Sequence, residues 1–424
     1  MGHSFCIAIK TKNDRVKCMN VLFLTIGQME NINDRGIYTD LLRQFRRQGH
    51  CIYTVSTYEK RKGLRTSACE ENGAHMLHVR IGNITKCSVI EKGISTLLIE
   101  PQFVGAIKKY FGSIKFDLVI YSTPPITFAN AVRYVQKRDG AKTYLLLKDI
   151  FPQNAVDIGM ITKSGIKGIL YKYFRSKEKK LYAVSDKIGC MSQANVDYVL
   201  RNNQGISPDK VEICPNSIEV IDNRLNAAQK AEVRRKHHIP SGKTVFVYGG
   251  NLGKPQDIPF IIRCLQANAA FDDRFFVICG SGTEYPKLKG YIDAEKPKNV
   301  MLMNGLPKEE YERFVGCCDV GLIFLDHRFT IPNFPSRLLS YMQKGMPVLA
   351  ATDPNTDVGA VIKDGNFGWQ CSSDSVEDFT KTVDTAIASD LDALGQNSFA
   401  YLNDHYTVKQ SIGTILHFYN GDRL

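Results

Sequence analysis

A glycine-rich stretch in the second half of the chain has the residue types that bind phosphate. Gly249-Gly250-Asn251-Leu252-Gly253-Lys254 directly follows the short apolar run Thr244–Tyr248. Glycines let the backbone approach a ligand closely and Lys254 adds a positive charge, so a phosphate group suits both features. The spacing is neither that of a Walker A loop nor GxGxxG, which disfavours a dinucleotide cofactor. A tight strand-to-helix turn without a ligand is the alternative that this stretch leaves open.

Three more loops of the second half follow predicted strands and contain residues suited to an anion. They are Cys279-Gly280-Ser281-Gly282-Thr283-Glu284, Asn304-Gly305-Leu306-Pro307, and the stretch from Thr330 to Met342, which contains Ser336-Arg337-Leu338-Leu339-Ser340. We predict that Ser336 caps a helix whose first N–H groups bind an anion together with Arg337. A solvated Arg337 that points away from the loops is the alternative. Because ligands bind beyond the carboxyl ends of parallel strands, the four loops together predict a crevice the size of a mononucleotide.

The first half of the chain offers a carboxylate and a basic segment. Asp149 follows a predicted strand, where it would orient a substrate hydroxyl or assist proton transfer, unless it only caps a helix or a turn. The segment Lys163–Lys187 holds eight basic residues with apolar and aromatic residues interleaved. This combination predicts peripheral contact with an anionic membrane surface. The alternative is a helix whose apolar stripe packs on the sheet and whose lysines are in water.

Composition limits the class of protein. The chain has 424 residues, of which 43% are hydrophobic and 23% charged, as in a globular protein of two domains. The sequence contains no apolar run long enough to predict a spanning helix, and its 12 cysteines lack metal-ligand spacing, so we expect no metal and a cytoplasmic location. Residues 1–217 hold 33 Lys/Arg against 18 Asp/Glu, whereas residues 218–424 hold 22 against 25. This one-sided charge indicates an anionic partner, and a solvated basic face without a partner is the alternative. No nucleic-acid-binding module is recognisable.

Short apolar runs alternate with helical stretches in both halves, which predicts parallel sheets. Strands are predicted at 20–25, 51–56, 76–79, 116–122, 143–147 and 187–191, and again at 244–248, 275–279, 300–303, 320–324 and 347–350. Helices are predicted at 37–48, 101–111, 126–137 and 165–182 in the first half, and at 258–269, 308–315, 336–344 and 376–389 in the second. We therefore predict an α/β chain with two doubly wound, Rossmann-like domains. The predicted divisions are an extension (1–18), a first domain (19–217), a linker (218–242), a second domain (243–405) and a C-terminal helix (406–424) that returns toward the first domain.

A set of motifs along the chain matches a known family when taken together, although none is specific alone. They are Ser122-Thr123-Pro124-Pro125, Asp149-Ile150-Phe151-Pro152, Val211–Asn216, Gly249–Gly253, Gly280-Ser281-Gly282, Pro335–Met342 and Gly345–Ala350. From Asn20 to about Tyr419, the chain resembles the retaining family-4 glycosyltransferases of the GT-B fold. The resemblance is greatest to the WbuB-like branch, which acts in bacterial capsule and lipopolysaccharide synthesis.

The resemblance implies that the two domains face each other across a cleft. A nucleotide-sugar, usually a UDP-sugar, would bind to the second domain, and the acceptor would bind to the first. Lys254 and Arg337 would stabilise charge on the leaving diphosphate without a metal or other cofactor, and Asp149 would position donor or acceptor hydroxyls. The implied donor-binding residues are Gly250, Asn251, Gly253, Lys254, Gly282, Leu306, Ser336, Arg337 and Ser340.

The chain departs from the family pattern at two positions. The family usually shows two Glu residues separated by seven others, and here those positions are Pro332 and Ser340. Ser340 offers the ribose one hydroxyl where a carboxylate would accept two hydrogen bonds. Two alternatives to a transferase follow: a non-catalytic GT-B subunit that supports a partner transferase, and a nucleotide-sugar epimerase. For the transferase, we expect a lipid-linked or oligosaccharide acceptor at the cytoplasmic face of the inner membrane, in capsule or O-antigen synthesis.

Overall fold

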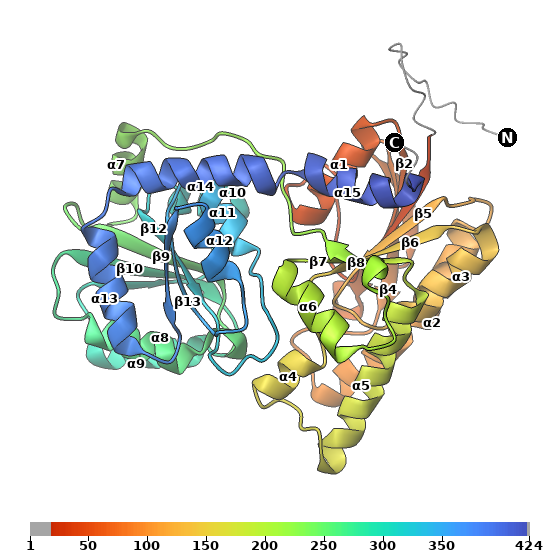
Figure 1. Cartoon of the computed structure of the whole chain (residues 1–424), viewed down its shortest axis with the longest axis horizontal. Coiled ribbons are helices and arrows are strands. Elements are labelled where there is room, and N and C mark those ends of the chain that lie inside the picture. Colours follow the sequence, from red (N-terminus) through yellow and green to blue (C-terminus); the bar gives the residue numbers. More distant parts are fainter. Residues whose placement is uncertain (1–17, 422–424) are drawn as a thin grey trace.

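The structure is a computed structural model that describes residues 18–421. Except for Cys18, the predicted extension 1–18 lies outside the described residues. Two α/β domains lie beside each other, and the last two helices run along one side of both (Figure 1).

The first domain is built on a sheet with the strand order β3-β4-β2-β1-β5-β6-β7-β8. Its neighbouring strands are parallel, except that β3 and β4 are antiparallel. Strands β1 and β5 are almost fully buried, as expected where helices cover both faces of a parallel sheet. The strands are β1 (Asn20–Leu24), β2 (Cys51–Glu59), β3 (Ser67–Glu71), β4 (Ala74–Ile81), β5 (Leu118–Ser122), β6 (Lys142–Leu147), β7 (Lys187–Cys190) and β8 (Val211–Ile213).

Two layers of helices cover this sheet. One face carries α2 (Val89–Tyr110), α3 (Ala129–Asp139), α5 (Gly165–Val184) and α6 (Gln193–Asn202), whose apolar residues share a core with the strands. The short helix α4 (Gln153–Asp157) follows β6. The other face carries α1 (Ile37–Arg47) and α15 (Val408–Asn420). Ile412 and Ile415 of α15 belong to the same core cluster as Phe45 of α1, so the end of the chain packs on the first domain.

The second domain is built on a parallel sheet with the order β11-β10-β9-β12-β13-β14. Its strands are β9 (Thr244–Asn251), β10 (Arg274–Ser281), β11 (Val300–Met303), β12 (Val320–Phe324), β13 (Val348–Thr352) and β14 (Gly368–Ser372). One face packs against α7 (Ala227–Lys236), α10 (Lys308–Val315), α11 (Arg337–Gln343), α12 (Val358–Asp364) and α14 (Leu391–His405). The other face packs against α8 (Ile258–Ala267), α9 (Tyr285–Glu295) and α13 (Val376–Ile387).

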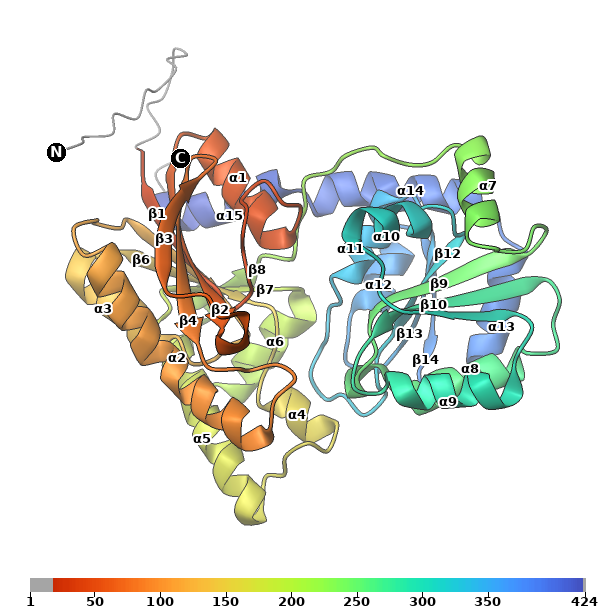
Figure 2. The same ribbon diagram turned by 180° about the vertical axis from the view of Figure 1, so that it is seen from behind.

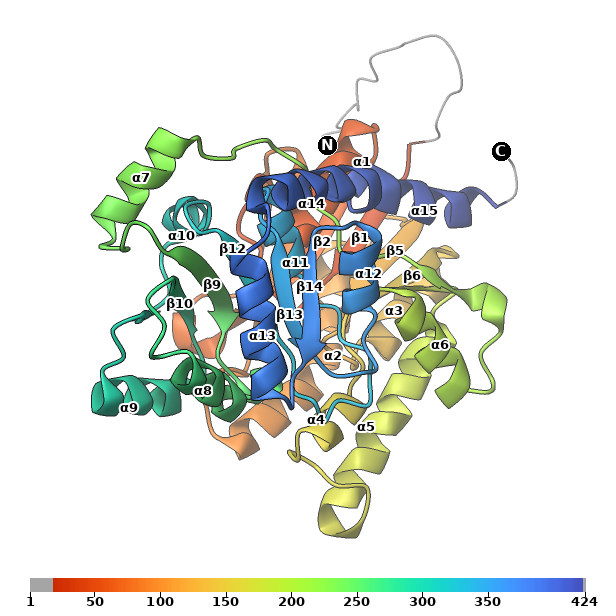
Figure 3. The ribbon, with the colours of Figure 1, turned by 60° about the vertical axis from the view of Figure 1, so that its left-hand side comes forward.

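The chain passes between the domains twice, and the two passages are hydrogen-bonded to each other. The N–H of Ile218 donates to the Tyr406 carbonyl at 3.0 Å, and the N–H of Val408 donates to the Ile218 carbonyl at 3.2 Å. Views from behind and from the side show α14 and α15 continuing across this junction (Figures 2 and 3). Loops that follow strands of the two sheets also meet, since the N–H of Thr330 donates to Asp157 at 2.8 Å. The carboxyl ends of both sheets therefore border the space between the domains.

Candidate active site

The glycine-rich turn after β9 packs closely against the loop after β10. Gly250 has a φ of +127°, a conformation that side chains rarely adopt. A Cβ at Gly280 would overlap the carbonyl oxygen of Gly250, and one at Gly282 would overlap the carbonyl oxygen of Leu252. Glycine at these positions therefore lets two loops pack backbone against backbone. The structure thus brings together the first two phosphate-binding loops that the sequence predicts.

Arg337 reaches this turn from the first residue of α11. Its guanidinium carbon lies 4.2 Å from the centre of the Tyr248 ring, which is a favourable position for a cation. Its Nη2 lies 3.3 Å from the place where a Cβ of Gly250 would stand. The alternative of a solvated Arg337 pointing away from the loops is therefore wrong.

Arg337 is half-buried, with its Nη1 atom shielded from water, and it has no acidic partner among the residues that the structure describes. Its Nη1 atom has no hydrogen-bond acceptor among the residues that the structure describes. Burial lowers the pKa of Arg337, but the neighbouring Tyr248 and Tyr341 raise it further, so the net direction is upward and the group stays charged. Burying an unpaired cation is costly, and a guanidinium matches a phosphate with two parallel hydrogen bonds. This arrangement is therefore suited to binding an anion.

Three tyrosines hold the turn and Arg337 in place, and the sequence analysis does not identify them. The Tyr341 hydroxyl accepts from the Gly249 N–H at 3.2 Å and donates toward the Leu322 carbonyl at 3.1 Å. Tyr311 of α10 lies against Gly249, where a Cβ would overlap its hydroxyl. Burial raises the pKa of Tyr341, so this hydroxyl stays neutral. Two of them could have been found from the sequence, because Tyr248 directly precedes the glycines and Tyr341 lies within the Pro335–Met342 motif.

The other predicted donor-binding residues lie at the end of β9 or in the turn after it, in the loop after β11, and at the start of α11 or within it. Asn251, Lys254, Ser336 and Ser340 are exposed, Gly253 is buried in the turn, and Leu306 is partly buried against the second-domain core. Gly253 donates its N–H to Gln256 Oε1 at 3.1 Å, which fixes the turn before Lys254.

Ser336 does not cap α11, contrary to the prediction. Its side chain makes no capping hydrogen bond, and its backbone is already helical, with φ −62° and ψ −19°. A capping side chain needs a non-helical backbone to turn back toward the free N–H groups. Because α11 has only seven residues, its dipole is small, and the positive charge at this edge comes mainly from Arg337.

Asp149 lies on the first domain, beyond the carboxyl end of β6. Its carboxylate accepts hydrogen bonds from Asn154 Nδ2 at 2.7 Å and from the N–H of Ile150. Burial raises the pKa of Asp149 to about 6, although both hydrogen bonds lower it. Among the described residues, its partners all belong to the first domain, so the structure does not bring Asp149 into contact with Arg337.

A cavity of about 640 Å³ lies between the domains. Its walls are the loop after β1, between Gln28 and Gly36, the first turn of α1, and the residues Lys308, Glu309 and Glu312 of α10. Lys308 donates to the Arg35 carbonyl, and the Arg35 guanidinium lies 3.6 Å from Glu312. Amide, carboxylate and cationic side chains together suit a ligand rich in hydroxyl groups.

Within residues 18–421, one group of side chains has ligand atoms close enough together for a metal ion. Asp257, Asp326 and His327 place such atoms within 4.8 Å of one another. However, Arg328 binds both carboxylate oxygens of Asp326 and neutralises its charge. This group therefore does not fit a divalent cation well.

The basic helix α5 presents its apolar stripe to solvent. Ile166 is 88% exposed and Ile169 is 71% exposed, while Lys163, Lys167 and Lys172 beside them are exposed too. The free end of α5 projects from the first domain (Figure 1). The alternative in which this stripe packs on the sheet is therefore wrong for its first turns. No helix among the described residues is both long and apolar enough to cross a membrane.

Comparisons with known proteins agree with this geometry. Residues 229–399 match the family model described as "Glycosyl transferases group 1". The probable glycosyltransferase WbjE of Pseudomonas aeruginosa is 23% identical over 328 residues, covering 76% of this chain and 78% of that protein. The putative colanic acid biosynthesis glycosyl transferase WcaI of Escherichia coli K12 is 22% identical over 255 residues, covering 59% and 60%.

Solved structures of other proteins share the fold over nearly the whole chain. HepE of Anabaena, in complex with UDP and glucose, superimposes with a TM-score of 0.67 at 12% identity, covering 95% of this chain and 99% of that one. WaaG, a glycosyltransferase involved in lipopolysaccharide biosynthesis, gives a TM-score of 0.62 at 12% identity, covering 93% and 99%. The chain thus has the GT-B fold, with two Rossmann-like domains, and the second domain carries the glycosyl transferases group 1 match. Together these similarities support a glycosyltransferase.

Proposed function

We propose that this chain is a retaining glycosyltransferase of the WbuB-like branch. It would move a sugar from a nucleotide-sugar, a UDP-sugar, to a lipid-linked or oligosaccharide acceptor in surface polysaccharide synthesis. The observation that carries the proposal is the half-buried Arg337, whose guanidinium lies beside Gly250 without an acidic partner among the described residues. The donor class is supported by the likeness to HepE, whose structure holds UDP and glucose. The pathway is supported by the names of WcaI and WaaG.

In this proposal, Arg337 and Lys254 bind the diphosphate of the donor. They stabilise the negative charge that develops on the leaving diphosphate as the bond to the anomeric carbon breaks. The acceptor hydroxyl forms the new bond to that carbon on the same face, and its proton passes to the leaving phosphate oxygen. The protein therefore needs no nucleophile of its own, and its main contribution is to position charge and substrates.

Asp149 and the loop after β1 would act from the acceptor side. With a pKa of about 6, the Asp149 carboxyl group is mostly ionised at neutral pH and can accept a hydrogen bond from a sugar hydroxyl. It lies on the first domain, whereas the donor loops belong to the second. Approach of the two domains would bring donor and acceptor together and exclude water.

We also propose that α5 rests on the anionic cytoplasmic face of the inner membrane. Exposed lysines would approach lipid phosphates, and the exposed Ile166 and Ile169 would enter the interface between headgroups and acyl chains. Helix α2 adds exposed apolar residues at Ile94, Leu97 and Leu98. A lipid-linked acceptor would then reach the cleft from the membrane surface.

A panel of nucleotide-sugars tests the proposed activity. A bound donor raises the melting temperature by mass action, so a UDP-sugar should stabilise the protein more than the matched GDP-sugar does. The stabilising donor is then incubated with lipid-linked acceptors, and its consumption is measured. Consumption only with acceptor present indicates transfer, whereas conversion of the donor alone to its epimer would indicate the epimerase. Absence of any stabilisation at millimolar donor would favour the non-catalytic subunit.

A further inference from the structure

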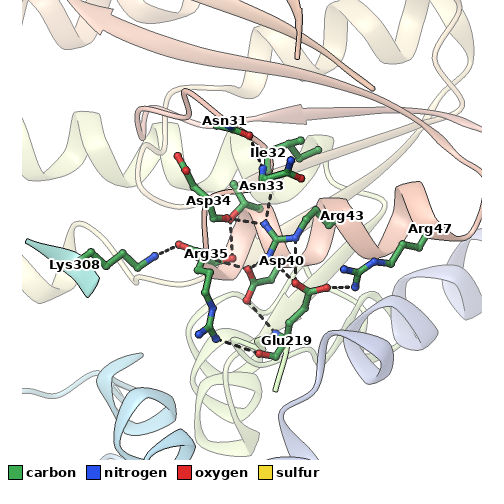
Figure 4. Close-up of polar contacts among 12 residues, drawn as sticks. Asn31, Ile32, Asn33, Asp34, Arg35, Asp40, Arg43, Arg47, Glu219 and Lys308 are labelled. Carbon is green, nitrogen blue, oxygen red and sulfur yellow. Dashed lines mark hydrogen bonds and ion pairs between the residues drawn. The ribbon is translucent and has the colours of Figure 1, made fainter. Parts of the chain in front are cut away.

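Arg43 of α1 uses all five of its N–H groups within the protein (Figure 4). Nη1 donates to the carbonyl oxygens of Ile32 and Asp34, at 2.6 and 2.7 Å. Nε and Nη2 donate to Glu219 at 3.1 and 2.7 Å, and Nη2 also donates to Asp40. The side chain is only 7% exposed, so these hydrogen bonds are shielded from water. One side chain thus joins the loop after β1 to the segment that enters the second domain.

Glu219 lies where the two interdomain passages meet. The preceding residue, Ile218, is hydrogen-bonded to Tyr406 and Val408 of the second passage. The N–H of Glu219 donates to Asp40 at 3.0 Å, while its carboxylate binds Arg43 and Arg47. The hinge between the domains is therefore fixed to α1 through both the backbone and the side chain of Glu219.

The loop that Arg43 holds forms a wall of the interdomain cavity. Asn31, Asn33, Asp34, Arg35 and Gly36 all line that cavity. On its far side the loop contacts the second domain, since Lys308 donates to the Arg35 carbonyl and Glu312 pairs with the Arg35 guanidinium. The wall is thus held at one end by the hinge and at the other by α10.

We propose that Arg43 is a positioning residue that ties the cavity wall, residues 31–36, to the hinge at Ile218–Glu219. Because Glu219 moves with the linker, the relative orientation of the domains sets the shape of the wall. The inference rests on the proposed function in that it takes the cavity to be part of the substrate cleft. A local ion pair within α1 would account for the contact with Asp40, but not for the hydrogen bonds to Ile32, Asp34 and Glu219.

Three variants of the full chain separate coupling from local stability. Arg43→Lys keeps the charge beside Asp40 but has too few N–H groups to reach every acceptor. Glu219→Gln weakens the link at the hinge without changing a loop residue, and it leaves the hydrogen bond from Arg35 Nη2 to the Glu219 carbonyl at 3.4 Å in place. Arg47→Lys is the matched control, because Arg47 is 57% exposed and pairs with the same carboxylate without contacting the loop. Hydrogen exchange in the loop is measurable because the N–H groups of Asn33 and Gly36 are hydrogen-bonded to side chains.

Hydrogen exchange of the free protein is the first measurement. We expect exchange in residues 31–36 to rise about ten-fold or more in Arg43→Lys and Glu219→Gln, and to stay within about two-fold in Arg47→Lys. Exchange in β5 should stay unchanged in all three, which shows that the domain remains folded. The proposed coupling would be overturned if hydrogen exchange in residues 31–36 were unchanged in Glu219→Gln. It would also be overturned if that exchange rose as much in Arg47→Lys as in the other two variants.

Titration with UDP is the second measurement. UDP should bind the wild type and Glu219→Gln with dissociation constants within about three-fold of each other, because Glu219 lies outside the donor loops. Bound UDP should slow exchange of residues 31–36 in the wild type but not in Glu219→Gln. If UDP binds the wild type but does not change hydrogen exchange in the loop, the relative orientation of the domains does not set the shape of the cavity wall. If UDP does not bind at all, the proposed function fails, and the free-protein result still decides whether Arg43 couples loop and hinge.

Discussion

The guanidinium of Arg337 is held in a position that costs stability when no ligand is bound. It lies over the Tyr248 ring, which returns part of the energy lost when a cation leaves water. Its Nη1 atom nevertheless has no acceptor among the described residues. An anion bound by Arg337, as we propose, would explain why the side chain is kept in this state.

Replacing Arg337 with an apolar residue of similar length should therefore not destabilise the protein. We expect Arg337→Met to leave the free energy of unfolding unchanged or to raise it by up to about 2 kcal/mol, measured by urea unfolding. Arg263→Met is the matched control, because Arg263 is exposed and lies over an aromatic ring of its own, that of Phe260. A clear loss of stability in Arg337→Met would show that the arginine is structural.

The raised pKa of the Asp149 carboxyl group predicts that the free energy of unfolding depends on pH. Burial raises its pKa from an ordinary value near 4 to about 6. Between these values the folded protein binds the proton more tightly than the unfolded chain, so stability should fall as pH rises from about 4 to 6. Asp149→Asn should remove on the order of 2 kcal/mol of this pH dependence, measured by urea unfolding at several pH values. If the free energy of unfolding varied with pH in the same way in the wild type and the variant, the raised pKa of Asp149 would be contradicted.

The chemistry of single residues was only partly predictable. Gly250, Gly282 and Arg337 follow strands in a recognisable order, and the structure brings them together. The sequence did not reveal that Ser336 is already helical or that Tyr311 lies against Gly249. Both facts depend on how α10 and α11 pack on the sheet, and local sequence does not encode such packing.

Among the elements, the loops after β9 and β10 depend on close backbone contact. Gly280→Ala should lower the free energy of unfolding by about 2–4 kcal/mol, because its methyl group would overlap the Gly250 carbonyl oxygen. Gly290→Ala in α9 is the control, since nothing lies within 4 Å of its Cβ position and alanine favours a helix by about 1 kcal/mol. Thermal unfolding measures both variants. Equal stability of Gly280→Ala and the wild type would mean that the two loops do not pack as described.

The exposed apolar and basic side chains of α5 predict that the protein binds lipid. The wild type should sediment with vesicles that contain anionic phospholipid and should be released by high salt. Ile166→Glu combined with Ile169→Glu should weaken this binding about ten-fold or more, because both apolar side chains would leave the interface. Ile221→Glu, which changes an exposed isoleucine on the linker, should have little effect. Equal vesicle binding by the double variant would exclude α5 as the contact.

The elements that were predicted correctly are those with a clear apolar pattern in the sequence. Strands β11 and β12 and the helix α10 between them have the predicted bounds. Strands β3, β8 and β14 were missed, because polar or exposed residues interrupt their apolar pattern. Helix α2 was predicted to begin at Pro101, but it starts earlier, at a Ser88 cap, and continues through that proline, which is exposed. A proline within a helix is unusual enough that the sequence pattern favours a start there.

At the scale of the whole molecule, the two sheets direct their carboxyl ends toward each other. Asp157 binds Thr330, and the N–H of Ala194 donates to Asp357 at 3.0 Å, so loops from both domains hold the cleft. The sequence predicted two domains of the correct kind. It did not predict their relative orientation, because that depends on a few contacts between residues more than a hundred positions apart.

Calorimetry with UDP tests directly whether the second domain binds a nucleotide diphosphate at Arg337. We predict that UDP binds the wild type and the control Arg263→Met with a dissociation constant of about 10–100 μM. Binding to Arg337→Met should be weaker by about ten-fold or more, a loss of about 1.4 kcal/mol. Absence of binding to the wild type at millimolar UDP, or equal affinity in all three proteins, would contradict the account.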